Sequence, residues 1–448
     1  MLERLRHHPA WPSTLVSLYL LIYISVDKRW IYSPVIEWDV CSYYSYIKGL
    51  LYEGDPYLRI WNVDSNRMQL YTYSSPHSEK MTGGMALLYL PAVAAAHLYA
   101  HVAPEFMADG ISHPYRVALQ YNVIVYLWVG FFTLYLVLYR IIRKHWPVFL
   151  SLLSLFFGTN LLYYSAVENA MSHAYTFSLF SLWLFLSQEW LMRPRAGIAV
   201  AMGLLAGLIV WIRPVNLVLL PSSLGLQWLM RKEDRSTHVR AKLPVHLAII
   251  ACFGFAMLIP QMIYWKITEG QWLVYSYGEE SFFFLSPKII DGLFSWRKGW
   301  LIYCPFLLIL VPGFVAVFRR SRKGGAWILG FVVLFLYITF SWWCWWYGGG
   351  YSQRSLIDIL PLLAIPIAFA WNLVPRFMRL VRLGVVILLC GLIGLNIFHV
   401  WQYKHYLIHY DSNTKKSYFI NFLRKTHAPG WWEALEAPDY DAARIGCR

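Results

Sequence analysis

Two acidic residues, Glu37 and Asp39, follow the first long apolar stretch of the chain. Charged side chains are costly in or beside lipid, so a carboxylate where an apolar run ends marks a candidate functional site. An aromatic and acidic segment follows directly and contains Tyr43 and Tyr44. The pattern predicts a site at a membrane surface, where a carboxylate meets a polar substrate.

Further charged and aromatic residues recur where other apolar runs end. Carboxylates can deprotonate a hydroxyl group, and arginine or lysine can hold a phosphate and stabilise it as it leaves. Together these residue types indicate transfer of a group from a lipid phosphate to a hydroxyl acceptor. The candidate residues are Glu168, His173, Arg213, Arg297, Lys298, Tyr347 and Arg354.

Simpler interpretations stay open for several of these residues. Aromatic side chains are enriched at membrane interfaces without binding sugars. Arg213 stands before Pro214 and could extend its side chain from a helix end to water. The three glycines at 348–350 could serve only to permit a tight turn.

Composition indicates a polytopic membrane protein. The 448 residues are 58% hydrophobic and only 14% charged, whereas soluble proteins have about 25% charged residues. The net charge of +15 comes from short basic clusters between apolar runs, as the positive-inside rule expects, so we exclude nucleic-acid binding. No small-residue cleavage site follows Val26, and we therefore expect an uncleaved N-terminal anchor.

Membrane topology follows from the apolar runs and the basic clusters. A span needs about 20 apolar residues, and a cytoplasmic N-terminus places every basic cluster in an inner loop. Counting Met85 to Ala103 as a span would invert the later loops. We therefore interpret it as an interfacial or re-entrant helix, the alternative being a true span with an uncounted partner. The eleven expected spans lie near 11–31, 117–139, 147–165, 173–192, 196–212, 215–230, 244–265, 300–318, 326–344, 356–374 and 383–401.

The expected fold class is therefore an all-α polytopic membrane protein with about 11 transmembrane helices and interfacial helices in the first outer loop. Residues 1–401 form the membrane domain, in which the outer loops 32–116 and 266–299 make the active-site face. The tail, residues 402–448, is too short for a typical independent domain, and we expect it to fold back on those loops.

At these residues the chain resembles the GT-C superfamily of polytopic glycosyltransferases, which use polyprenyl-phosphate sugars. It is most similar to the bacterial protein O-mannosyltransferase and aminoarabinose transferase group, over about residues 1–400. That likeness implies a GT-C-like fold and a bacterial inner membrane, with the active site on the periplasmic side. The motifs in order are Glu37-Trp-Asp39 with Tyr43-Tyr44, Gly84 to Pro91, Met171-Ser-His173, Arg213-Pro-Val-Asn216, Ser295 to Gly299 with Pro305, and Trp345 to Arg354 with Asp358 and Pro361.

The resemblance implies residue roles. Asp39 would be the catalytic base, taking the acceptor proton as the hydroxyl attacks the sugar C1, with inversion of the anomeric configuration. Glu168 would be a second catalytic carboxylate, although its neighbours depart from the family pattern. The donor phosphate would be held by Arg297, Lys298, Arg354 and Arg213, and the substrate by Glu37, Tyr43, Tyr44, His173 and Tyr347.

The implied partners are a polyprenyl-phosphate-linked sugar donor, a hydroxyl acceptor on a lipid, glycan or protein, and membrane lipids. We expect no cofactor. The oligosaccharyltransferase branch of the superfamily uses a divalent metal, but no clear acidic set for one is evident here. The alternative functions are an O-antigen-type polymerase or ligase, or a lipid-linked glycan flippase. A flippase would require charges or broken helices near the bilayer midplane, and the apolar runs here look mostly uninterrupted.

Overall fold

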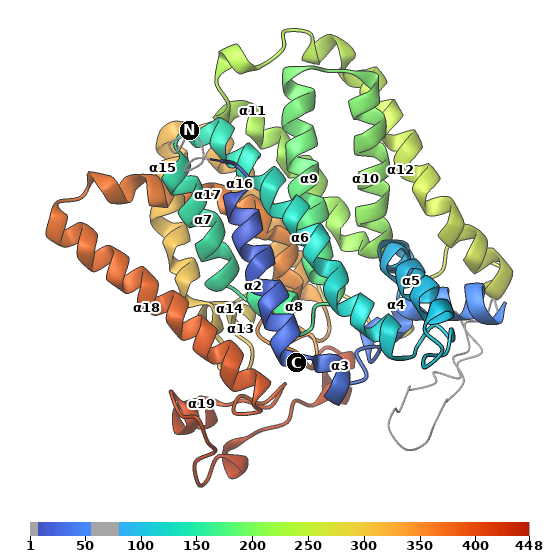
Figure 1. Ribbon diagram of the computed structural model, residues 1–448. Coiled ribbons are helices and arrows are strands. Elements are labelled where there is room, and N and C mark those ends of the chain that lie inside the picture. The colour runs from blue at the N-terminus through green and yellow to red at the C-terminus, as the bar shows by residue number, and fades with distance from the viewer. Residues whose placement is uncertain (1–7, 55–79, 448) are drawn as a thin grey trace.

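The chain folds into a bundle of helices in the computed structural model, which describes residues 8–54 and 80–447 (Figure 1). Within those ranges the only strand-like pairing is an isolated bridge between Phe282 and Trp342. The prediction of an all-α protein is therefore confirmed. Large aromatic and aliphatic side chains fill one continuous core.

Six helical stretches in the described residues are long and apolar enough to cross a membrane. This agrees with a membrane protein, while the predicted eleven spans and the GT-C-like fold stay predictions. Two shorter apolar helices, α7 and α10, and the helices α2 and α9 lie among them (Figure 1). The six are α5 (Gly84–Val102), α6 (His113–Ile142), α12 (Val239–Glu269), α16 (Arg322–Ser341), the stretch Arg354–Arg376, and α18 (Arg379–Lys404). The other four are α2 (Trp11–Asp27), α7 (His145–Phe157), α9 (Ser172–Met192) and α10 (Ala196–Ile212).

Five of the predicted runs are interrupted or change helix type, so the expectation of uninterrupted spans holds only for the other six. Proline removes a helical hydrogen bond and clashes with the preceding turn, which accounts for the helix ends just before Pro214 and Pro305. The five runs form α2 then α3 (Arg29–Tyr32), α7 then α8 (Leu161–Ala166), η2 (Pro214–Gly225) then α11 (Leu226–Leu229), α14 (Trp300–Tyr303) with η4 (Pro305–Ile309) and α15 (Leu310–Arg320), and η5 (Arg354–Ile359) then α17 (Leu360–Leu373).

The two ends of the bundle differ in what they carry. The end of α9 lies beside the segment that precedes α12, where the Ser236 amide donates to the Leu191 carbonyl over 2.9 Å. This contact brings the basic clusters after α9 and before α12 together. The other helix ends that carry basic clusters also lie toward the upper end in Figure 1. The lower end carries the short elements α3 (Arg29–Tyr32), α4 (Asp39–Ile47), η1 (Lys48–Glu53), α13 (Ile289–Phe294), α19 (Lys415–Asn421), η7 (Trp432–Ala434) and α20 (Tyr440–Arg444).

Helix α5 packs along the first half of α6 only. Asn122 and Tyr126 of α6 donate to the Leu88 carbonyl over 3.0 and 2.9 Å, and His97 Nδ1 lies 2.7 Å from the Tyr115 hydroxyl. The two helices are thus antiparallel, and α5 ends beside the start of α6. Half-coverage is what an interfacial or re-entrant helix would show, although α5 is also long and apolar enough to span.

Two glycines one turn apart bring α10 and α12 into close contact. A Cβ atom on Gly207 would lie 2.4 Å from the Gly254 carbonyl oxygen, and one on Gly203 would lie 2.8 Å from Phe253 Cβ. Small residues four apart let apolar helices approach closely and gain dispersion contacts. The pair holds the end of α10, where Arg213 follows, against a long and mostly exposed helix.

We predict that Gly207→Ala destabilises the protein by about 1–3 kcal/mol, because the added methyl group meets backbone that cannot move aside. The thermal midpoint in detergent measures this effect. The matched control is Gly197→Ala on the same helix, where an added Cβ meets nothing within 4 Å. Equal midpoints for the two variants would contradict the close packing.

Candidate active site

The site is centred on an ion pair between Asp39 and Arg354. Asp39 is the first residue of α4, where the positive end of the helix dipole favours a carboxylate. Arg354 opens the 3-10 helix η5 (Arg354–Ile359), and its Nη1 lies 3.1 Å from Asp39 Oδ2. Both side chains are mostly buried, at 25% and 20% exposure. The structure thus brings together two predicted site residues from opposite parts of the chain.

The backbone just before Asp39 is strained. Trp38 has φ 51° and ψ −129°, a conformation that residues with a side chain rarely adopt. The residue is also 70% exposed, which is unusual for tryptophan. Strain of this kind costs about 1–3 kcal/mol and clusters at functional sites. It therefore supports Asp39 as a functional position.

A second ion pair lies inside the bundle, between Arg213 and Asp358. Arg213 Nε lies 3.4 Å from Asp358 Oδ2, and Thr176 donates to Oδ1 of the same carboxylate over 2.5 Å. Arg213 also donates to His173 Nδ1 over 2.7 Å, so that nitrogen carries a lone pair and the imidazole is neutral. Asp358 is fully buried and His173 is 3% exposed. Arg213 is therefore an ion-pair partner within the bundle and does not simply extend to water.

Lys298 points toward the same region as Arg354. Its Nζ donates to the Gly350 carbonyl, and the residue is 2% exposed. Burial, followed by the nearby Arg354 guanidinium, lowers the pKa of Lys298 to about 7. Gly350 has φ +144°, and a Cβ there would lie 2.6 Å from the Tyr164 hydroxyl. Gly350 thus lets the chain pass close to Tyr164, beyond merely permitting a turn.

The two remaining predicted carboxylates have different surroundings. Glu37 pairs with Arg29 over 2.8 Å, and Arg29 also donates to the Val167 carbonyl over 2.7 Å. Arg29 thereby connects the first loop to the turn that carries Glu168. Glu168 accepts a hydrogen bond from Tyr163 over 3.0 Å and lies near enough to Lys298 to act on its charge. Glu168 thus lies near Lys298 and also near Arg29, whose direct ion-pair partner is Glu37.

Of the predicted tyrosines, Tyr43 lies beside Asp39, Tyr347 lies near enough to Arg213 and Arg354 to feel their charges, and Tyr44 is in a packing position. The Tyr43 hydroxyl lies 3.2 Å from Ser172 Oγ, and burial and the Asp39 carboxylate raise the pKa of Tyr43. Tyr44 is fully buried and donates to the Gly110 carbonyl. Tyr347 donates to the Thr339 carbonyl over 2.8 Å. Of the three tyrosines, Tyr43 is the one whose hydroxyl is affected by the Asp39 carboxylate.

Arg297 faces the tail and not the Asp39–Arg354 pair. Its Nη1 donates to the main-chain oxygens of Asp411 over 2.6 Å and Glu436 over 3.1 Å. Its guanidinium also lies 6.0 Å from the Trp346 ring centre. The neighbouring residues Arg297 and Lys298, both predicted to hold a phosphate, therefore point to different parts of this end of the bundle.

Three further residues contribute to this region, although the sequence motifs indicate no site role for them. Asp358 and Thr176 complete the Arg213 network, and Tyr164 accepts the Tyr351 amide over 3.0 Å beside Gly350. Thr176 follows His173 by three residues, a spacing that places both on one helix face. No comparable signal marks Tyr164, because its role depends on the distant glycine segment.

No protein-family model, no curated protein and no solved structure matches this chain.

We predict that Asp358→Asn destabilises the protein by about 3–5 kcal/mol, because it leaves the Arg213 charge buried without its partner. Thermal unfolding in detergent would show a large drop in the midpoint. The control is Asp441→Asn, since Asp441 is 98% exposed and lies 4.0 Å from Arg444, and exposed pairs contribute little. A midpoint for Asp358→Asn equal to that of the control would contradict the buried pair.

Proposed function

We propose that the chain is an inverting glycosyltransferase of the GT-C type, moving a monosaccharide from a polyprenyl-phosphate donor to a hydroxyl acceptor. The observation that carries the proposal is the ion pair of Asp39 with Arg354, next to the buried Lys298. A base for the acceptor and cations for the leaving phosphate thereby lie side by side. This is the combination that displacement at a sugar phosphate requires.

Asp39 is proposed as the general base. Its carboxylate takes the proton of the acceptor hydroxyl while that oxygen attacks the sugar C1. The bond from C1 to the phosphate oxygen breaks, and the polyprenyl phosphate leaves with the electron pair from the opposite face. The product is therefore a glycoside of inverted configuration, and a protonated Asp39 returns its proton to water.

Arg354 would exchange partners during this reaction. In the structure its guanidinium neutralises Asp39, which limits the basicity of that carboxylate. A donor phosphate competes for the same guanidinium, since arginine binds phosphate through paired hydrogen bonds. Binding of the donor would then release Asp39 to act as a base only when a sugar is in place.

Lys298 and Glu168 would assist the leaving group and the sugar. Lys298 is buried beside Arg354 and would add positive charge next to the departing phosphate. Glu168 lies near these cations and is proposed as the second carboxylate, supporting positive charge on the sugar ring in the transition state. With two side-chain cations in place, the proposed reaction uses no cofactor.

The proposed location is a bacterial inner membrane, with the N-terminus in the cytoplasm and the site in the periplasm. Its support is that the Asp39 end of the bundle is opposite the end where the basic clusters gather (Figure 1). The breaks at residues 158–160 and at Pro305 also belong to the site end, where Asn160 donates to the Gln353 carbonyl over 2.8 Å. These breaks are therefore proposed to shape the site.

We expect Asp39→Asn to lower the rate of sugar transfer by about 10²–10⁴-fold, because the amide cannot accept the hydroxyl proton. Donor affinity should be retained or raised, because the amide no longer competes with the donor phosphate for Arg354. The assay uses purified protein with radiolabelled polyprenyl-phosphate monosaccharides and a membrane extract as the acceptor source. The control Glu279→Gln alters an exposed outer-loop carboxylate. Retained turnover in Asp39→Asn would refute the assignment of the base.

Donor affinity should fall as the pH rises through about 7. The pKa of Lys298 is lowered to about 7, so the charged ammonium predominates below that pH and the neutral amine above it. The phosphodiester of the donor stays anionic throughout, and losing a charged hydrogen bond weakens binding by about tenfold. Titration with a fluorescent donor analogue from pH 6 to 8.5 measures this change.

The Lys298→Met variant should bind the donor weakly, with no step near pH 7. The exposed Lys425→Met should keep the wild-type pH profile. A step of equal size in Lys298→Met would assign the titration to another group.

A further inference from the structure

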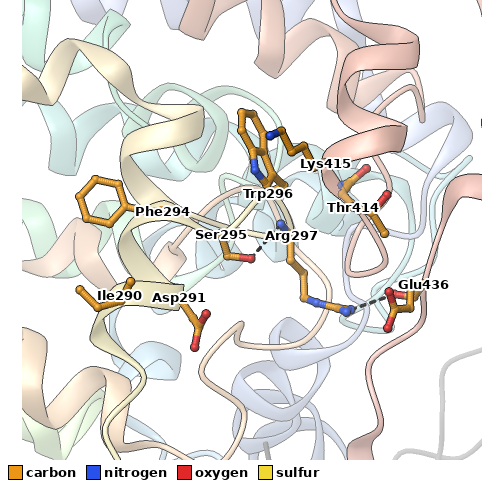
Figure 2. A pocket seen from close by; sticks show the side chains of 10 residues that line it. Ile290, Asp291, Phe294, Ser295, Trp296, Arg297, Thr414, Lys415 and Glu436 are labelled. Atoms are coloured by element: carbon orange, nitrogen blue, oxygen red, sulfur yellow. Dashed lines mark hydrogen bonds between the residues drawn. The ribbon is translucent and has the colours of Figure 1, made fainter.

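A pocket lies between the segment around α13 and the C-terminal tail. It has a volume of about 310 Å³ and is lined on one side by residues 290, 291 and 294–297 and on the other by residues 413–415 and Glu436. Figure 2 shows Trp296 beside Lys415, and Arg297 reaching toward Glu436. This volume is at the lower end of the range for small-molecule sites, about 300–1,000 Å³.

The lining combines an aromatic surface with polar groups of both signs. Trp296 is held in place by Tyr418 and Phe419, whose ring centres lie 4.9 and 5.0 Å away. Asp291 and Glu436 supply carboxylates, and Lys415 supplies an ammonium group. A few fixed polar groups around an aromatic wall are typical of a site that orients a small ligand.

The charge balance selects the class of ligand. The formal charges of Asp291, Glu436, Arg297 and Lys415 cancel. A free phosphate would meet two carboxylates, and a metal ion would meet two cations, so neither is favoured. A neutral sugar suits both signs, because its hydroxyl groups donate to carboxylates and accept from lysine, while its apolar face can lie on an indole ring.

The pocket and the Asp39 site are joined through two adjacent residues of the chain. Arg297 lies in the pocket wall, whereas Lys298 points to Gly350. Arg297 also anchors the opposite wall, through the main-chain oxygens of Asp411 and Glu436. The tail is thus joined to the loop that carries a proposed phosphate-binding residue.

We propose that this pocket binds a neutral sugar unit of the acceptor, distinct from the sugar being transferred, so that the acceptor is a glycan. The inference rests on the proposed transferase function and deepens it by naming the acceptor class. The tail then serves as one wall of an acceptor subsite.

The test measures sugar binding directly, without turnover. Full-length protein in nanodiscs is titrated with neutral disaccharides of glucose, galactose, mannose and N-acetylglucosamine, and saturation-transfer NMR reports binding. The variants are Asp291→Asn and Lys415→Met, and the matched control is Lys416→Met, an equally exposed neighbour that does not line the pocket. Inorganic phosphate is titrated as the anionic probe.

We expect at least one disaccharide to bind, with its Kd raised about tenfold in both pocket variants and unchanged in Lys416→Met. Donor affinity should be unchanged in all three variants. The inference is overturned if no disaccharide binds, if Lys416→Met weakens binding equally, or if phosphate binds more tightly than every sugar.

Donor consumption measured on the same preparation separates this inference from the proposed function. Protein that consumes donor but binds no disaccharide would overturn the acceptor pocket alone. Protein that shows pocket-dependent disaccharide binding but consumes no donor would overturn the transferase, and would leave the pocket as a sugar-binding site.

Discussion

The Arg213–Asp358 ion pair is the constraint around which the rest of this region is arranged. An unpaired charge in a low-dielectric interior costs several kcal/mol, so each partner requires the other. The pair joins the end of α10 to η5, and its bonds to His173 and Thr176 add the start of α9. Arg354 opens the same η5 segment. The geometry of the Asp39–Arg354 pair therefore depends on a second, deeper pair.

Much of the fold could be predicted from composition alone. Every run expected to span is mostly helical in the structure, because an apolar stretch in lipid must satisfy its own backbone hydrogen bonds. The breaks could not be placed as readily, since proline sets where a helix stops and not how the next piece continues. Helix α5 could be found but not assigned to one membrane arrangement, because its apolarity fits both.

The site residues were predictable as individuals and not as partners. Asp39 and Arg354 stand out because charge is costly where apolar runs end, but their contact depends on packing between distant segments. Arg213 fitted an exposed helix end until its buried partners were placed. Arg297 and Lys298 are adjacent and chemically alike, and nothing in their sequence shows that one faces the tail and the other faces Gly350.

Helices α10 and α12 differ greatly in length although two glycines hold them together. At 1.5 Å per residue, the 17 residues of α10 extend about 26 Å and the 31 residues of α12 about 46 Å. The hydrocarbon layer of a bilayer is about 30 Å thick, and an apolar run longer than this adapts by tilting; the apolar run of α12, residues 244–265, extends about 33 Å. Helix α12 contacts α10, and Arg213 follows α10 directly. A change in lipid chain length that alters the tilt of α12 would therefore shift the position of Arg213 relative to Asp358.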